Sequence, residues 1–584
     1  MLGIAWVPLP DIRRWLALAA ALVVLNLALT FHNVWPTLWV TYRHELSIEI
    51  ALLLLALLAY HRLAGSPSRR LLGVLAVLLT LLTAGRYADV TASALYGRPI
   101  NLYWDVRHAP TVLLMLASAA PPWQVAAAGG VLLLVASVFG ALHWALGRVA
   151  AGLAVVAERR MVALVAGASA SLYLAGLASP RMPSEHWFSL PVTPLYARQA
   201  GFIAAALFER AGAESLPVPP ASDSDLAAVA GADVVVIFLE SYGATAYDNP
   251  DYATALAPSR QALATAVAAS GRQAASALVR SPTFGGASWL AHASFLSGIE
   301  VADHRHYALL LTQRRDTLAH RFARHGYRPV AVMPGLRQAW PEGAYYGFAQ
   351  IYDADGLEYR GPELGFWRIP DQYALAKLDH AELGPSPRSP RFVFFPTISS
   401  HLPFRPTPPY QPDWQRVLTA DAFDAEAYQV AIDLEADFND LGPAYLDALD
   451  YAYRCLAGYL RLRPGADQVL IVLGDHQPAA SVSGEGAGWE VPVHLITNRH
   501  ELVQRLLQAG FSPGLSPRRP AYAAMHELTG LLLRVFDGGS AAPLGAKDGV
   551  DIAGGAVRGH RPQPLAQVGG TQPAALGEPV ALPR

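Results

Sequence analysis

Five long apolar runs in the first third of the chain constrain its fold more than any other feature. The hydrocarbon core of a bilayer is about 30 Å thick, and a helix of about 20 apolar residues crosses it. We therefore expect an α-helical transmembrane domain of about five spans over residues 1–179. The first run is followed by further spans and shows no clear small-residue cleavage site, which argues against a cleaved signal peptide. The runs cover about residues 15–31, 45–60, 71–85, 125–146 and 161–178.

Cationic residues are distributed unevenly between the two sides of these spans. By the positive-inside rule, the side with more of them is cytoplasmic. That side includes the N-terminus, so everything after the fifth span is expected outside the cytoplasm. The cationic side holds Arg13, Arg14, His61, Arg62, Arg69, Arg70, Arg148, Arg159 and Arg160, and the opposite connections hold Arg43, Arg86, Arg98 and Arg107.

The pattern changes beyond the spans. Residues 180–230 contain several prolines and an acidic stretch, as in a connector, and Trp187 to Phe208 could form an interfacial amphipathic helix. Over residues 231–551, short apolar runs alternate with helical segments, which predicts an α/β domain with a mainly parallel sheet sandwiched by helices. Residues 552–584 are rich in Gly, Pro, Ala and Gln, so we expect a disordered tail.

Composition narrows the classes of function. The 584 residues are 53% hydrophobic and 15% charged, which is too apolar for an ordinary soluble enzyme. The formal net charge of −2 gives no reason to expect a nucleic-acid partner. Because Cys455 is the only cysteine, the chain can form no intramolecular disulfide.

A glycine-flanked hydroxyl, Ser288, lies at the expected start of a helix in the sequence Phe284-Gly-Gly-Ala-Ser-Trp-Leu. Backbone N–H groups at a helix N-terminus stabilise anions, so a serine there could attack a bound phosphate or sulfate group. The same pattern also fits an ordinary helix N-cap. The motif alone leaves both interpretations open.

Polar residues follow two buried apolar runs. Glu240 ends the run that begins at Asp233, while Asp475 and His476 end the run that begins at Gln468. In open α/β sheets, ligands bind at the carboxyl ends of the strands, so these residues can converge there with Ser288. Two carboxylates, an imidazole and a serine oxygen make a mixed N/O site for one divalent ion such as Zn²⁺ or Mn²⁺.

These three motifs resemble the alkaline phosphatase and sulfatase superfamily. The similarity is to its membrane-anchored branch, which includes lipoteichoic acid synthases, periplasmic glucan phosphoglycerol transferases and lipid A phosphoethanolamine transferases. The sulfatase signature is Cys/Ser-x-Pro-Ser-Arg, and here Ala291 and His292 replace its Ser-Arg pair. That departure favours an unmodified serine and phosphoryl transfer. The absence of disulfides favours the phosphoglycerol or lipoteichoic type over the phosphoethanolamine type.

The resemblance implies roles for individual residues. Glu240, Ser288, Asp475 and His476 would be the metal ligands, with Ser288 also the nucleophile. His401, after the apolar run Arg391 to Pro396, matches a substrate-binding histidine. Further substrate-binding candidates are Arg337, three residues before Trp340, together with Trp289 and His292 beside Ser288. A solvated arginine, a loop histidine and a helix-surface histidine are the alternatives for Arg337, His401 and His292.

The sequence therefore predicts a metal-dependent phosphotransferase of the bacterial inner membrane, with its catalytic domain in the periplasm. It would move a phospholipid headgroup, phosphoglycerol or phosphoethanolamine, through a serine-linked intermediate to a glycan or glycolipid acceptor. The alternatives are a membrane-anchored sulfatase or phosphodiesterase that hydrolyses a glycan, and a catalytically inactive scaffold.

Overall fold

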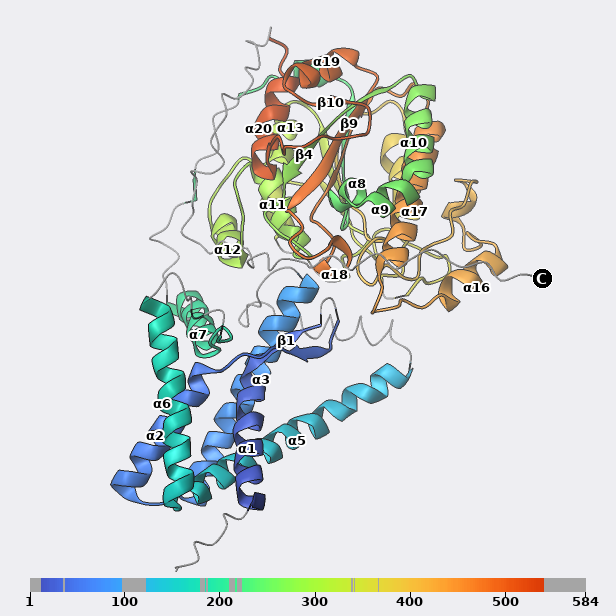
Figure 1. The fold of residues 1–584 in the computed structure, drawn as a ribbon. Coiled ribbons are helices and arrows are strands. Elements are labelled where there is room, and N and C mark those ends of the chain that lie inside the picture. Colours follow the sequence, from blue (N-terminus) through green and yellow to red (C-terminus); the bar gives the residue numbers. More distant parts are fainter. Residues whose placement is uncertain are drawn as a thin grey trace, which may run out of the picture. The chain divides into compact units, whose positions relative to one another are not determined.

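The computed structural model describes residues 12–34, 37–96, 122–178, 184, 187–208, 216–217, 223–337, 340, 342–365 and 367–539. The expected tail, residues 552–584, and part of the expected connector lie outside the described residues. Figure 1 shows the helical N-terminal part of the chain and the α/β part that follows it.

Long apolar helices make up the N-terminal part, as expected. Four helices in the described residues are long and apolar enough to cross a membrane, one fewer than the five expected. The remaining apolar helix, α2, has 17 residues. At 1.5 Å per residue it spans about 26 Å, at the lower limit of the length that crosses a bilayer. The helices are α1 (Ile12–Thr30), α2 (Ile48–Ala64), α3 (Arg69–Tyr96), α5 (Pro122–Leu153) and α6 (Val156–Ala178).

Two smaller elements accompany these helices. Strands β1 (Phe31–Asn33) and β2 (Val40–Tyr42) form an antiparallel pair after α1. Helix α7 (Thr193–Phe208) begins later than the expected Trp187. The Glu49 carboxylate of α2 accepts hydrogen bonds from the backbone N–H groups of Val192 and Thr193, at 2.5 and 3.2 Å. This contact satisfies a carboxylate that would be costly to leave unpaired among apolar helices.

A mixed, mostly parallel sheet organises the rest of the chain, as the sequence predicts. Its order in the described residues is β10-β4-β9-β8-β3-β7-β5-β6, and β11 pairs with β4. The central strands β8, β3, β7, β5 and β6 pair in parallel, whereas β9 pairs antiparallel with both β8 and β4. The strands are β3 (Asp233–Leu239), β4 (Gln273–Arg280), β5 (Arg328–Val332), β6 (Gln350–Tyr352), β7 (Arg391–Pro396), β8 (Gln468–Gly474), β9 (Glu490–Thr497), β10 (Ser512–Pro513) and β11 (Ala523–Ala524).

Helices cover both faces of this sheet. Along β3, Val234, Val236 and Phe238 pack into one apolar core, and Val235, Ile237 and Leu239 pack into the other. The period-2 alternation of side chains therefore puts apolar residues on both faces, which is why the strand reads as a continuous apolar run. One face carries α11 (Ser288–Ser297), α13 (Leu318–Arg324), α19 (His500–Gln508) and α20 (Met525–Phe536); the other carries α10 (Ala257–Ala269), α15 (Asp371–Leu378) and α17 (Gly442–Leu462) (Figure 1).

Shorter helices connect these layers and lie mainly in the loops. They are α8 (Thr245–Asp248), α9 (Pro250–Ala255), α12 (His304–Thr312), α14 (Gly343–Tyr346), α16 (Ala425–Asp433) and α18 (Ala480–Ser483).

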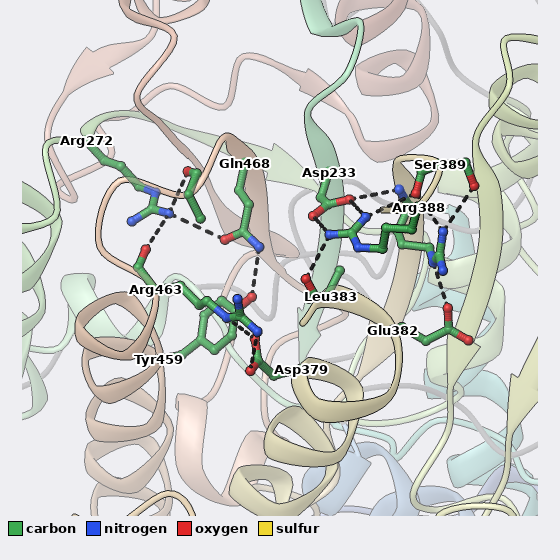
Figure 2. Close-up of polar contacts among 12 residues, drawn as sticks. Asp233, Arg272, Asp379, Glu382, Leu383, Arg388, Ser389, Tyr459, Arg463 and Gln468 are labelled. Carbon is green, nitrogen blue, oxygen red and sulfur yellow. Dashed lines mark hydrogen bonds and ion pairs between the residues drawn. The ribbon is translucent and has the colours of Figure 1, made fainter. Parts of the chain in front are cut away.

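Ion pairs gather at the amino ends of the central strands (Figure 2). Asp233, the first residue of β3, binds both Arg388 guanidinium nitrogens at 2.7 and 2.5 Å and accepts from the Arg391 backbone N–H. Arg391, the first residue of β7, binds Glu382 at 2.6 Å. Because these pairs lie at the amino ends, they are at the opposite edge of the parallel strands from Glu240 and Asp475.

Candidate active site

Parallel strand pairing brings the two acidic motifs together. Strands β3 and β8 are in register, with Leu239 opposite Gly474. The next residue on each strand is therefore a carboxylate, Glu240 or Asp475. Gly474 allows this close approach, since a Cβ atom there would lie 1.8 Å from the Tyr242 carbonyl oxygen.

Ser288 is the first residue of α11, and the N-cap position belongs to Ala287. Ala287 adopts a left-handed conformation with φ 62°, and Ser241, next to Glu240, has φ 58°. The Ser288 hydroxyl donates to Glu240 Oε2 at 3.0 Å and lies 3.2 Å from His476 Nε2. The ordinary N-cap interpretation of the motif is therefore wrong, because this hydroxyl faces the carboxylates instead of capping the helix.

Glu240, Asp475 and His476 form a compact buried group. One candidate ligand atom from each lies within 4.8 Å of the others. His476 Nε2 lies 3.3 Å from Glu240 Oε1 and 3.6 Å from Asp475 Oδ2. The other ring nitrogen, Nδ1, is 2.7 Å from the Gln477 carbonyl oxygen. A proton on Nδ1 would leave the Nε2 lone pair facing the carboxylates, which is the tautomer that binds metals.

Asp475 Oδ2 is buried and has no hydrogen-bond partner among the described residues. Its other oxygen, Oδ1, accepts from the backbone N–H groups of Ser241 and His476 at 2.8 and 2.7 Å. A buried carboxylate oxygen without a partner is costly, and a cation would remove that cost. The donor set therefore fits a divalent ion, with one nitrogen ligand and the remainder oxygen.

The electrostatics of the group favour bound positive charge. Burial and the neighbouring Glu240 charge raise the pKa of Asp475 to about 8. Burial lowers the pKa of His476, but the Asp475 charge and the Glu240 hydrogen bond outweigh it and raise the pKa to about 9. For Glu240, burial is outweighed by the His476 hydrogen bond and the His401 charge, and its pKa falls below the usual range. A metal ion bound at this group would displace the protons of Asp475 and His476 and compensate the same negative charge.

Other residues hold the backbone around this group, and no sequence pattern predicted these roles for them. The Thr397 hydroxyl accepts from the Glu240 N–H at 3.0 Å, and the Ser400 hydroxyl donates to the Glu240 carbonyl at 2.7 Å. The buried Asp371 carboxylate accepts from the backbone N–H groups of Ile398 and Ser399, at 2.7 and 2.9 Å. These contacts join residues far apart in the chain, so only the fold reveals them.

The four expected substrate-binding residues lie in different surroundings. The centre of the His401 ring lies 4.7 Å from that of Trp367, with the two rings tilted at 55°, and the His401 charge helps to lower the pKa of Glu240. His292 is not a helix-surface residue, since its ring lies 4.7 Å from Phe238 and burial lowers its pKa to about 3. Trp289 is half-buried, with its ring 5.1 Å from His304. Arg337 is exposed in the segment after β5.

Comparisons with known proteins give matches among solved structures only. No protein-family model and no curated protein matches the chain. The lipoteichoic acid synthase LtaP of Listeria monocytogenes is 14% identical with a TM-score of 0.33, over 48% of this chain and 69% of that one. The Streptococcus pyogenes phosphoglycerol transferase GacH, in complex with sn-glycerol-1-phosphate, is 12% identical with a TM-score of 0.35, over 56% and 85%. The C-terminal periplasmic domain of Escherichia coli EcEptC is 13% identical with a TM-score of 0.34, over 54% and 84%.

A further match is a Vibrio parahaemolyticus protein of the alkaline phosphatase superfamily, 15% identical with a TM-score of 0.34 over 57% of this chain and 73% of that one. The matched proteins thus include transferase types that the motifs resemble.

Proposed function

We propose that the chain is a membrane-anchored phosphotransferase that moves a phospholipid headgroup, phosphoglycerol or phosphoethanolamine, to an extracytoplasmic acceptor. The observation that carries the proposal is the Ser288 hydroxyl beside Glu240, His476 and the unpartnered Asp475 oxygen. A nucleophilic hydroxyl next to a buried cation site is suited to attack on a phosphodiester.

Glu240, Asp475 and His476, with Ser288, would hold one Mn²⁺ or Zn²⁺ ion. When bound, the ion lowers the pKa of a coordinated hydroxyl and neutralises charge on the transferred group. The Ser288 hydroxyl donates its hydrogen bond to Glu240, so the Glu240 carboxylate is an available acceptor for its proton. The N-terminus of α11 supplies backbone N–H groups and a positive dipole end for the phosphate.

The reaction would proceed in two displacements. Ser288 Oγ gives its proton to Glu240 and forms a bond to phosphorus while the bond to the diacylglycerol oxygen breaks; the proton returns to Oγ when the second displacement releases the serine. An acceptor hydroxyl then forms its own bond to phosphorus, and the Ser288 Oγ–phosphorus bond breaks. His401, with Nδ1 hydrogen-bonded to the Leu402 carbonyl at 2.8 Å, would give a proton to the leaving alkoxide and later take one from the acceptor hydroxyl.

The proposal places the site outside the cytoplasm. Helix α2, at 17 residues, lies at the lower limit of the length that crosses a bilayer, about 17–25 residues. With α2 counted, the apolar helices give five crossings and put the chain beyond α6 on the side opposite the N-terminus. A lipid donor in the same membrane is then accessible without a soluble carrier.

The test is intact mass spectrometry of the full-length protein after incubation with Mn²⁺ or Zn²⁺ and either phosphatidylglycerol or phosphatidylethanolamine. Wild type should gain the mass of one headgroup phosphate, and Ser288→Ala should gain nothing. A mass gain by both proteins would overturn Ser288 as the nucleophile. Bound metal with headgroup release to water but no transfer would favour hydrolysis, and no bound metal would favour an inactive scaffold.

A further inference from the structure

An exposed apolar patch lies on the β1–β2 hairpin, outside the helices of the N-terminal part. Trp39 is 72% exposed and Leu38 is 63% exposed, so the described part of the chain leaves both largely uncovered. A contiguous apolar surface of this kind marks a place where another molecule binds. The patch, which we call the hairpin patch, consists of Val34, Leu38, Trp39, Val40 and Tyr42.

The turn that carries the patch is held in one shape by its own hydrogen bonds. The Val34 N–H donates to the Trp39 carbonyl oxygen at 2.8 Å. The Asn33 side-chain amide donates to the Thr37 carbonyl oxygen at 2.7 Å, and the Thr37 hydroxyl accepts from the Trp39 N–H at 3.0 Å. Because the backbone at the turn is paired in this way, the patch is a formed surface and its side chains are presented together.

Helix α3 holds this hairpin at the end of α1 (Figure 1). Strand β1 begins at Phe31, directly after the last residue of α1. The Arg86 side chain of α3 donates from Nε to the Phe31 carbonyl oxygen at 2.9 Å, and the Tyr87 hydroxyl donates to the Leu38 carbonyl oxygen at 3.0 Å. Such support matters because two strands alone are barely stable in water.

These contacts place the hairpin at one surface of the bilayer. Both α1 and the Arg69–Ala92 part of α3 are long and apolar enough to cross a membrane. The hairpin follows the end of the first and contacts the second near the end of its apolar part. It therefore lies where the two helices leave the hydrocarbon, which is the depth that Trp and Tyr side chains prefer.

The charges beside the patch favour a phospholipid over other occupants. Arg43 and His44 directly follow the patch and are exposed. Glu45, the next residue, is paired with His32 at 2.7 Å, so its negative charge is compensated when that histidine is protonated. An apolar surface with an adjacent cation matches acyl chains below a layer of phosphate groups.

We propose that the hairpin patch binds phospholipids of the leaflet at the Thr30 end of α1. Trp39 and Leu38 would lie among the upper parts of the acyl chains, with Arg43 at the level of the phosphates. The hairpin would thereby fix the depth of α1 and α3 in the bilayer. This inference goes beyond the proposed transfer and does not depend on it, because it uses no residue of the Ser288 site.

The test measures the depth of a nitroxide label on the full-length protein in nanodiscs of phosphatidylethanolamine and phosphatidylglycerol. Cys455 is the only cysteine and is buried, so a label goes to an introduced cysteine. Trp39→Cys carries the label in the patch. The hydrocarbon reference is Leu164→Cys, which is equally exposed on the candidate span α6, and the water reference is Ala420→Cys in the α/β part. Power saturation compares access of oxygen, which concentrates in hydrocarbon, with access of a water-soluble nickel chelate.

We expect the oxygen-to-nickel ratio at Trp39→Cys to be several-fold above that at Ala420→Cys and below that at Leu164→Cys. Leu38→Cys should give the same result, which guards against a local effect of one substitution. A ratio equal to that of Ala420→Cys would mean that the patch lies in water and would overturn the proposal. Low access of both reagents would mean that protein covers the patch and would also overturn it, with spin–spin broadening identifying a second copy of the chain as the cover.

A second comparison tests the phosphate contact. Adding Arg43→Gln to Trp39→Cys should shift the ratio toward the water value, because a cation near the surface is attracted to anionic lipid. Arg324→Gln, at an exposed ion pair of the α/β part, should leave the ratio unchanged. Equal ratios for the two double variants would overturn the contact between Arg43 and the phosphates.

Discussion

Asp475 is the residue whose surroundings most favour a cation, since one of its oxygens is buried beside another carboxylate and has no hydrogen-bond partner among the described residues. We expect Asp475→Asn to reduce bound Mn²⁺ or Zn²⁺ from about one ion per chain to near zero, because amides are weak ligands for these ions. Without metal, the same substitution should change the Tm little, because burial beside Glu240 keeps Asp475 protonated near neutral pH and the Asn side chain can accept the same backbone hydrogen bonds. Elemental analysis and thermal unfolding with and without chelator would measure both effects.

A matched control is Glu382→Gln, which alters another buried carboxylate. Glu382 lies at the opposite edge of the sheet, paired with Arg391. That variant should keep its metal and lose stability. Equal metal contents in Asp475→Asn and wild type would exclude Asp475 as a ligand.

The buried histidine His494 leads to a separate prediction, on the pH dependence of folding stability. It is buried on β9, where its ring contacts the hydroxyls of Ser276 and Tyr242 at 2.6 and 2.9 Å. Burial lowers the pKa of His494 to about 3. Between pH 6.5 and 3 the unfolded chain binds a proton that the folded chain does not. The His494 contribution to stability is therefore complete above pH 6.5 and is lost as the pH falls, by at most about 1.4 kcal/mol per pH unit.

Replacing His494 with Gln should weaken the fall in Tm between pH 7.5 and 5.5, although it also lowers the Tm at both values. His500→Gln, at an exposed position on α19, should leave the pH dependence as in wild type. Thermal unfolding across this pH range would measure the slopes. Identical slopes for the two variants would mean that His494 does not stay neutral in the folded protein.

At the scale of elements, the two ends of the central strands differ: the carboxyl ends lead into the candidate site, and the amino ends carry stabilising ion pairs. The carboxyl ends of β3 and β8 lead into Glu240 and Asp475, and the amino ends carry the ion pairs of Asp233 and Arg391. We expect Asp233→Asn to destabilise the α/β part by about 3 kcal/mol, because it leaves Arg388 unpaired in a partly buried place. Metal content should be retained in the folded protein.

Asp316→Asn is the control for this prediction. It breaks an exposed ion pair with Arg324, 2.7 Å long, and should cost no more than about 1 kcal/mol. Thermal unfolding and elemental analysis of both variants would suffice. Loss of metal in Asp233→Asn without loss of stability would contradict the division between the two edges.

Strand ends were the part of the candidate site that could be predicted from the sequence. Glu240 and Asp475 each follow an apolar run, and parallel pairing places such residues side by side. Asp371 could not be predicted, because its partners are the backbone N–H groups of Ile398 and Ser399, which leave no trace in side-chain pattern. The surroundings of His292 could not be predicted either, because its aromatic neighbours Phe238 and Phe394 come from β3 and β7.

The helices and sheet were also predictable, with one exception of length. The apolar runs gave the positions of the N-terminal helices, but α2 is shorter than a typical span. Its last turn contains His61 and Arg62. Hydropathy alone locates a helix. Whether a helix this short crosses the bilayer depends on whether flanking side chains such as His61 and Arg62 reach the membrane–water interface.

For the whole molecule, the proposed orientation can be tested with thiol labelling. Cys455 is the only cysteine and is buried, so it gives little background. We expect Ala420→Cys, at an exposed position, to react with a membrane-impermeant maleimide in intact spheroplasts. Ser66→Cys, between α2 and α3, should react only after lysis. Labelling of both in intact spheroplasts would contradict five crossings.

The left-handed backbone at Ala287 and Ser241 has a consequence for how the protein can change over generations. Both residues flank a proposed ligand, and a non-glycine residue there costs about 1–2 kcal/mol. Glycine, asparagine and aspartate tolerate that conformation, whereas valine, isoleucine and threonine do not. Few residue types are therefore acceptable at these two positions beside the proposed site. Related sequences should vary less there than in the surface loops.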